Sequence, residues 1–148
     1  MKKIAIFGST GSIGSSLLKI IKKDKKNFKI ELLTGHKNYK KLIKQAKIFN
    51  VKNIIISDAN SFLITSKILV NTKIKVFKSF ESLNKIFNKN NKIDYTMCAI
   101  SGFQGLKPTF DIIKYTKIIA IANKESIICG WNLIKEELKK YKTNFIPV

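Results

Sequence analysis

Three glycines near the start of the chain form the pattern best suited to binding a ligand. The segment Gly8-Ser-Thr-Gly-Ser-Ile-Gly14 follows the apolar run Ile4–Phe7 and precedes apolar residues at helical spacing, which predicts strand, turn and helix. The first glycine permits the bend, the second lets backbone amides approach an anion, and the third permits close helix packing. Free N–H groups at the start of the helix then stabilise a pyrophosphate. The residues expected beside it are Thr10, Gly11, Ser12 and Ile13.

An alternative for this turn is purely structural. Its spacing is G-x-x-G-x-x-G rather than the G-x-G-x-x-G of many NAD enzymes, and glycine turns also join strands to helices where no ligand binds. The turn directly follows the first predicted strand, which is where a first βαβ unit places a dinucleotide. That position favours the ligand-binding interpretation.

The end of the second predicted strand, Phe28–Leu33, suggests which dinucleotide would bind. A carboxylate at this place selects NAD by binding the ribose 2′-hydroxyl. The segment carries none; instead Lys37 offers a cation suited to the 2′-phosphate of NADP, and His36 could add a second donor. The alternatives are that Asn38 caps the next helix and that both Lys37 and His36 are ordinary surface residues.

The triplet Asn123-Lys124-Glu125 is the third group with chemical potential. It follows a predicted strand, so its side chains would lie at the same sheet edge as the glycine turn. An amide there can bind nicotinamide or ribose, and an ammonium can hold a polyol or phosphate group. Equally, Asn123 can cap a helix, with Glu125 interacting favourably with the helix dipole. Sequence position alone leaves both interpretations open.

Strands and helices alternate around these groups. Further strands are predicted at 54–56, 74–77, 93–100, 117–122 and 143–148, and helices at 13–21, 39–49, 60–70, 79–88, 106–113 and 127–141. This order predicts a Rossmann-like, doubly wound α/β fold, with a mostly parallel sheet and helices on both faces, over a single domain 1–148. Ala99–Gly102 should line the dinucleotide cleft at the strand ends, while Asp58 should cap a helix.

Composition narrows the possible functions. A net charge of +20 would suggest nucleic acid or an anionic membrane, but all 29 basic residues are lysine and they are scattered. Arginine, the preferred residue for bidentate phosphate and guanine contacts, is absent. We therefore expect neither nucleic acid nor membrane as a partner.

No signal sequence or membrane-length apolar run is seen, so a cytoplasmic location is expected. Cys98 and Cys129 form no zinc pattern and should be reduced and packed.

Together these motifs resemble the N-terminal, NADPH-binding domain of the 1-deoxy-D-xylulose 5-phosphate reductoisomerase family. The resemblance rests on Gly8-Ser-Thr-Gly-Ser-Ile-Gly14, Gly35-His-Lys-Asn38, Gly102-x-x-Gly105-Leu-x-Pro-Thr109, Ala122-Asn-Lys-Glu-Ser126 and Ile146-Pro-Val148. It implies an oxidoreductase of isoprenoid precursor synthesis. Enzymes of this family isomerise 1-deoxy-D-xylulose 5-phosphate and reduce the product to 2-C-methyl-D-erythritol 4-phosphate, using NADPH and a divalent metal, Mg²⁺ or Mn²⁺.

The resemblance also implies individual roles. It places Thr10, Gly11, Ser12 and Ile13 at the pyrophosphate, Lys37 and Asn38 at the adenosine end, Asn123 and Glu125 at the cofactor, and Lys124 at the substrate. His36 departs from the pattern, because a glycine is usual there. Its side chain would either crowd the ribose phosphate or bind it.

The family's metal ligands lie in an Asp-Ser-Glu motif directly after the Pro-Val strand, and the chain has no compact acidic pair in its place. We therefore expect residues 1–148 to hold NADPH but to lack metal ligands and a complete catalytic set. The metal-binding and C-terminal domains, the phosphorylated sugar substrate and a possible homodimer would belong to the full-length enzyme. Two alternatives remain: another NADP-dependent dehydrogenase, for a semialdehyde or a sugar, and a non-enzymatic dinucleotide sensor.

Overall fold

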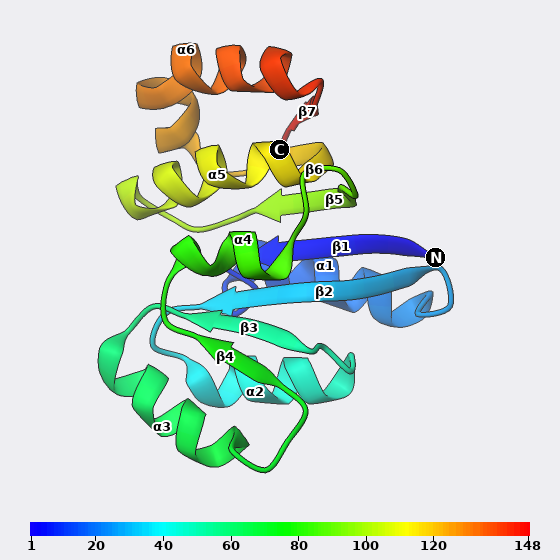
Figure 1. Cartoon of the computed structure of the whole chain (residues 1–148), viewed down its shortest axis with the longest axis vertical. Coiled ribbons are helices and arrows are strands. Elements are labelled where there is room, and N and C mark those ends of the chain that lie inside the picture. The colour runs from blue at the N-terminus through cyan, green and yellow to red at the C-terminus, as the bar shows by residue number, and fades with distance from the viewer.

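Seven parallel strands form one sheet in the computed structural model, which describes residues 1–148 (Figure 1). The strands are β1 (Lys2–Phe7), β2 (Phe28–Gly35), β3 (Asn53–Ile56), β4 (Lys75–Phe77), β5 (Ile93–Cys98), β6 (Thr116–Ile121) and β7 (Asn144–Pro147). The helices are α1 (Ser12–Lys23), α2 (Tyr39–Ile48), α3 (Ala59–Leu69), α4 (Leu83–Ile86), α5 (Leu106–Ile112) and α6 (Lys124–Tyr141). The predicted doubly wound α/β fold is confirmed.

The strand order, β4-β3-β2-β1-β5-β6-β7, places β1 at the centre of the sheet. The chain moves outward from β1 to β4, then crosses back to β5 on the other side of β1. This reversal is the topological switch point at which open α/β sheets bind ligands. Phe7 of β1 pairs with Cys98 of β5, so the two strands end side by side.

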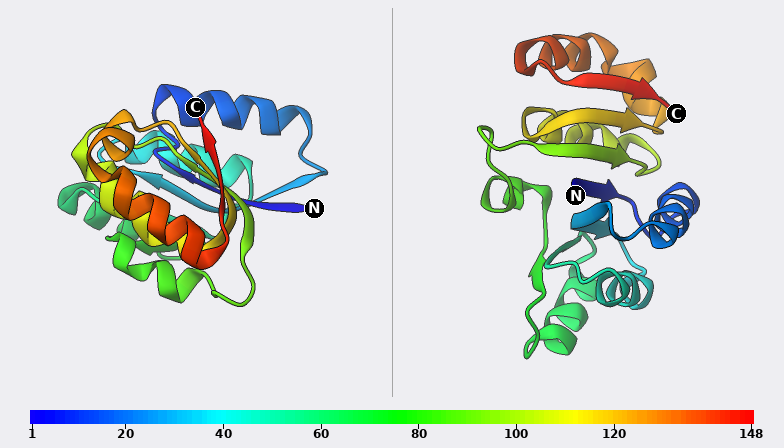
Figure 2. Two further views of the ribbon diagram at one scale, coloured as in Figure 1. Left: turned by 90° about the horizontal axis from the view of Figure 1, so that it is seen from above. Right: turned by 90° about the vertical axis from the view of Figure 1, so that its right-hand side faces the viewer.

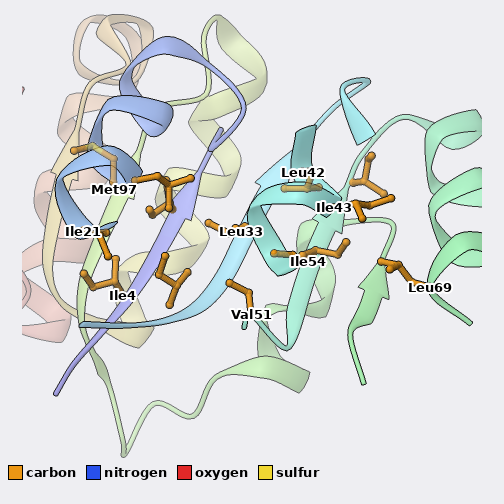
Figure 3. Packing of buried hydrophobic residues seen from close by; sticks show 14 of the residues in the cluster. Ile4, Ile21, Leu33, Leu42, Ile43, Val51, Ile54, Leu69 and Met97 are labelled. Carbon is orange, nitrogen blue, oxygen red and sulfur yellow. The ribbon is translucent and has the colours of Figure 1, made fainter. Parts of the chain in front are cut away.

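Helices cover both faces of the sheet (Figure 2). One apolar core lies beneath α1, α2 and α3, and a second lies beneath α4, α5 and α6. Figure 3 shows the first core, where Leu33 and Ile54 of neighbouring strands lie near Leu42 of α2. The run Ile54–Ile56 contributes to both cores, because alternate side chains of a strand point to opposite faces.

The helix predicted at 79–88 is much shorter in the structure, so this prediction is wrong in its bounds. The structure has a 3₁₀ turn at Phe80–Ser82, the short helix α4, and then Phe87 in extended conformation with φ −121° and ψ 153°. Both aromatic residues are held by tertiary contacts: Phe80 packs on Phe7 at 5.1 Å between ring centroids, and Phe87 packs on Tyr115 at 6.1 Å. These contacts, all on one face of the sheet, decide the path of the crossover, and the local helical periodicity does not.

Two smaller expectations can be compared with the structure. Asp58 caps α3 as predicted, since its carboxylate accepts a hydrogen bond from the Ser61 N–H at 3.0 Å.

Both cysteines are free; Cys98 is buried, and burial raises the pKa of its thiol to about 12. The prediction that Cys129 is packed is wrong, because it lies exposed on α6. None of the helices combines the length and apolar character needed to span a bilayer.

Candidate dinucleotide-binding site

A cleft of about 470 Å³ opens at the carboxyl edge of the sheet, at the switch point. It is lined by Gly8, Thr10, Gly11, Thr34, Gly35, His36, Ser57, Phe80, Ala99, Ile100, Ser101 and Gln104. These residues come from the exits of β1, β2, β3 and β5 and from the turn before α4. The cleft therefore lies where the sequence places it, and the expected segment Ala99–Gly102 contributes three residues to its wall.

The first and last glycines of the turn are required by the packing of the protein itself. Gly8 has φ +77°, and a Cβ built there would lie 2.6 Å from the Ala99 carbonyl oxygen. A Cβ on Gly14 would lie 2.5 Å from the Gly8 oxygen and 2.6 Å from the Ser9 Cα. Real Cβ atoms do not approach backbone so closely. These two glycines therefore let α1 and the β5 exit pack against the end of β1.

Gly11 differs, because internal packing does not explain it. Its backbone, with φ −74° and ψ 177°, is extended and suits any residue. A Cβ built there would meet only the Gly8 carbonyl oxygen, at 3.4 Å. The residue is exposed and lines the cleft, so the missing side chain leaves room on the ligand side. This is the arrangement a backbone needs in order to approach a pyrophosphate closely.

The turn also presents free hydrogen-bond donors. The N–H groups of Ser9 and Gly11 are bonded, to the carbonyls of Thr34 and Gly8 at 2.9 and 3.1 Å. No partner within the chain is found for the N–H groups of Thr10, Ser12 and Ile13, and no side chain caps α1. Unpaired donors together with the positive end of the helix dipole make this point favourable for an anion.

Polar side chains from neighbouring elements hold the turn in place, and none of them was predicted from the sequence. The Thr34 hydroxyl accepts the Gly8 N–H at 2.9 Å. Lys41 of α2 donates from Nζ to the Thr10 carbonyl at 2.7 Å, and Gln45, one turn later, bonds Ser9. A signal existed for Gln45, which is a polar residue on the apolar face of α2. For Lys41 there was none, since lysines abound in this chain.

At the exit of β2, where the adenosine end of the cofactor is predicted, His36, Lys37 and Asn38 occupy different environments. His36 lines the cleft, and its Nδ1 lies 2.9 Å from the Ser57 hydroxyl. Lys37 is exposed next to it, outside the cleft lining. Asn38 takes the capping role, since its side-chain oxygen accepts the Lys41 N–H at 3.2 Å. Its amide nitrogen is left without a partner in the chain, so a contact with the cofactor stays a prediction.

Asp58, which directly follows Ser57 at the exit of β3, has its carboxylate near Lys37 and His36. Hydrogen bonds from Ser61 lower the pKa of the Asp58 carboxyl, and the charges of Lys37 and His36 lower it further. The carboxylate is engaged at the start of α3, where it accepts both the Ser61 N–H and the Ser61 hydroxyl. Asp58 is thus occupied as a cap, and Lys37 has no carboxylate within ion-pair distance.

The Asn123-Lys124-Glu125 triplet begins α6, as the structural alternative predicted. Asn123 is 3% exposed; its oxygen accepts the Ser126 N–H at 2.7 Å, and its nitrogen donates to the carbonyls of Ile100 and, at 2.8 Å, of Gly102. The side chain therefore ties the wall of the cleft to α6, and its direct contact with a cofactor stays a prediction. Lys124 is exposed and Glu125 half-buried, and neither has a side-chain partner.

No group of three or more His, Cys, Asp or Glu side chains lies close enough together to hold an ion. Hard divalent cations require several oxygen ligands, and none of the residues that line the cleft carries a carboxylate. A dinucleotide is the ligand that the described residues fit.

Comparison with known proteins agrees with this geometry. The model of the 1-deoxy-D-xylulose 5-phosphate reductoisomerase family matches residues 4–130. A relative from Pelagibacter ubique with that name is 81% identical over 148 residues, which is 100% of this chain and 38% of the relative. The chain thus spans about two fifths of the length of the curated relatives that it matches.

Solved structures give the same result at lower identity. The reductoisomerase from Zymomonas mobilis in complex with NADPH superposes with a TM-score of 0.88 at 29% identity, covering 99% of this chain and 38% of that one. A reductoisomerase in complex with NADPH, fosmidomycin and magnesium has a TM-score of 0.89 at 30% identity, covering 99% and 36%.

Proposed function

This chain belongs to the 1-deoxy-D-xylulose 5-phosphate reductoisomerase family, and we propose that residues 1–148 form its NADPH-binding domain. The observation that carries the proposal is the glycine turn at the switch point. It presents unpaired N–H groups at Thr10, Ser12 and Ile13. Beside them lies Gly11, where the packing of the protein leaves room for a side chain although none is present. That combination suits the pyrophosphate of a dinucleotide.

NADPH would lie along the cleft from one strand exit to the next. The pyrophosphate would bind the turn and the start of α1. The 2′-phosphate would lie at the β2 exit beside His36, Lys37 and Asn38. The nicotinamide end would then lie towards the β5 exit, whose wall Asn123 supports through its bonds to Ile100 and Gly102. When bound, NADPH supplies the hydride for the reduction.

For the whole protein we propose the activity of the family, the isomerisation and reduction of 1-deoxy-D-xylulose 5-phosphate. Family membership favours this over another dehydrogenase or a sensor. Within residues 1–148, Lys124 and Glu125 stand free at the start of α6, and Lys124 would contact the phosphorylated substrate. The divalent metal, a homodimer and a cytoplasmic location stay predictions for the whole protein.

Replacing Lys37 with alanine should remove most of the preference for NADPH over NADH. A cation bonded to the 2′-phosphate contributes about 1.5–3 kcal/mol, which corresponds to roughly a tenfold to hundredfold difference in Kd. Isothermal titration calorimetry of the wild-type protein and of Lys37→Ala, with each nucleotide, measures this ratio. We expect a wild-type preference of at least about tenfold, and a residual ratio below about threefold in the variant.

Lys40→Ala is the matched control, because Lys40 is an exposed lysine of α2 and its loss changes the net charge equally. It should leave the ratio of the two dissociation constants unchanged. Equal affinity of the wild-type protein for NADPH and NADH would contradict the role of Lys37. Equal effects of the two substitutions would show a general charge effect only.

A further inference from the structure

Gln45 is a buried polar residue whose side chain spans from α2 to the glycine turn. It is 8% exposed and lies on the face of α2 that also buries Leu42 and Ala46. Its Nε2 donates to the Ser9 carbonyl at 2.9 Å, and its Oε1 accepts from the Ser9 hydroxyl at 2.8 Å. Gln45 and Ser9 are 36 positions apart in the sequence, and each donates one hydrogen bond to the other.

The carbonyl bonded by Gln45 belongs to the peptide unit that precedes Thr10. Because a trans peptide is planar, fixing the direction of the Ser9 C=O also fixes the direction of the Thr10 N–H, which points the opposite way. That N–H is among the donors with no partner in the chain. Gln45 thus sets the orientation of an unpaired donor on a cleft-lining residue, Thr10, although Gln45 itself is not part of the cleft lining.

The next peptide unit is held in the same way from the same helix. Lys41 donates to the Thr10 carbonyl at 2.7 Å, and the Gly11 N–H at the other end of that unit bonds the Gly8 carbonyl at 3.1 Å. Consecutive peptide planes of the turn are therefore oriented from α2, which itself begins directly after His36, Lys37 and Asn38.

We propose that Gln45 is a positioning residue for pyrophosphate recognition, holding the Thr10 N–H in the direction that the phosphate requires. This rests on the proposed NADPH-binding function and adds to it a residue that touches neither cofactor nor substrate. A pre-oriented donor binds an anion more tightly than a mobile one, because less conformational freedom is lost on binding.

The test variant is Gln45→Met, which keeps the side-chain length and removes both hydrogen bonds. The Ser9 groups keep other partners, since the Ser15 hydroxyl also reaches the Ser9 carbonyl at 3.2 Å and the Ser9 hydroxyl reaches the Thr34 carbonyl at 3.2 Å. The comparison variant, Ser9→Ala, removes the hydroxyl but leaves the Ser9 carbonyl bonded to Gln45. Urea unfolding of each variant confirms that it is folded.

Binding is measured by NMR titration with two ligands, NADPH and 2′-AMP, of which 2′-AMP lacks the pyrophosphate. We expect Gln45→Met to weaken NADPH binding about tenfold, the loss of one oriented hydrogen bond, while 2′-AMP binding changes by less than about twofold. The Thr10 amide signal should shift on NADPH addition in the wild-type protein and in Ser9→Ala. In Gln45→Met that shift should be strongly reduced.

Unchanged NADPH affinity in Gln45→Met, or an equal loss for NADPH and 2′-AMP, would overturn the proposal. If Gln45→Met does not fold, Gln45→Leu, which also removes both hydrogen bonds without adding a charge, is judged by the same criteria. If neither variant folds, the role of Gln45 is structural and the proposal is wrong. A wild-type protein that binds neither ligand would instead overturn the proposed function, so the two failures are distinguishable.

Discussion

Gly11→Ala is expected to weaken NADPH binding by about a hundredfold while leaving the stability of the fold nearly unchanged. The added Cβ would lie 3.4 Å from the Gly8 oxygen, an ordinary contact, and the backbone conformation is open to alanine. On the ligand side, the methyl group would occupy space that the pyrophosphate needs. Displacing the pyrophosphate from one or two charge-assisted hydrogen bonds costs about 3 kcal/mol, which corresponds to an increase of about a hundredfold in the Kd.

Calorimetric titration with NADPH, paired with urea unfolding, measures both halves of this prediction. Ser16→Ala on the exposed side of α1 is the control; it should leave the Kd unchanged and alter the free energy of unfolding by no more than about 0.5 kcal/mol, the difference in helix propensity. Wild-type affinity for NADPH in Gly11→Ala would show that the pyrophosphate does not approach the turn at this residue. A large loss of stability would show that the space around Gly11 serves packing instead.

Gly14→Ala should have the opposite effect, with a large loss of stability. Glycine to alanine within a helix ordinarily stabilises a protein by about 0.5–1 kcal/mol. Here the new Cβ would lie 2.5 Å from the Gly8 oxygen and 2.6 Å from the Ser9 Cα, both backbone atoms that cannot rotate away. Separating α1 from the end of β1 to relieve this overlap should lower the free energy of unfolding by about 3 kcal/mol.

Urea unfolding followed by circular dichroism measures this change directly. Gly11→Ala, three residues earlier in the same turn, is the internal comparison because it makes the same chemical change where space exists. A Gly14→Ala protein as stable as the wild type would mean that α1 does not pack on β1 as closely as described. The pair of substitutions thus separates the glycine required by the fold from the glycine required by the ligand.

The parts of this fold that local sequence could predict are those set by local chemistry. The glycine turn was predictable, because its spacing after an apolar run leaves few other structures, and Asp58 was recognised as a cap from its place before a helix. The run Ile54–Ile56 indicated a strand buried on both faces. These features depend on neighbouring residues, and so a single sequence reveals them.

The features that sequence reasoning missed depend on contacts between distant segments. The crossover at 79–88 is broken because Phe80 and Phe87 pack on Phe7 and Tyr115, which local periodicity cannot reveal. Gln45 reaches Ser9 only once α2 lies against the end of β1. For Asn123, sequence left cap and cofactor contact equally open, and the structure shows the cap.

The most direct test of the central claim is a crystal structure of this protein with NADPH bound. We predict density for the pyrophosphate over Gly11, with its oxygens within hydrogen-bonding distance of the N–H groups of Thr10, Ser12 and Ile13, and the 2′-phosphate beside Lys37. Density for NADPH elsewhere on the molecule, or a pyrophosphate away from the glycine turn, would contradict the account.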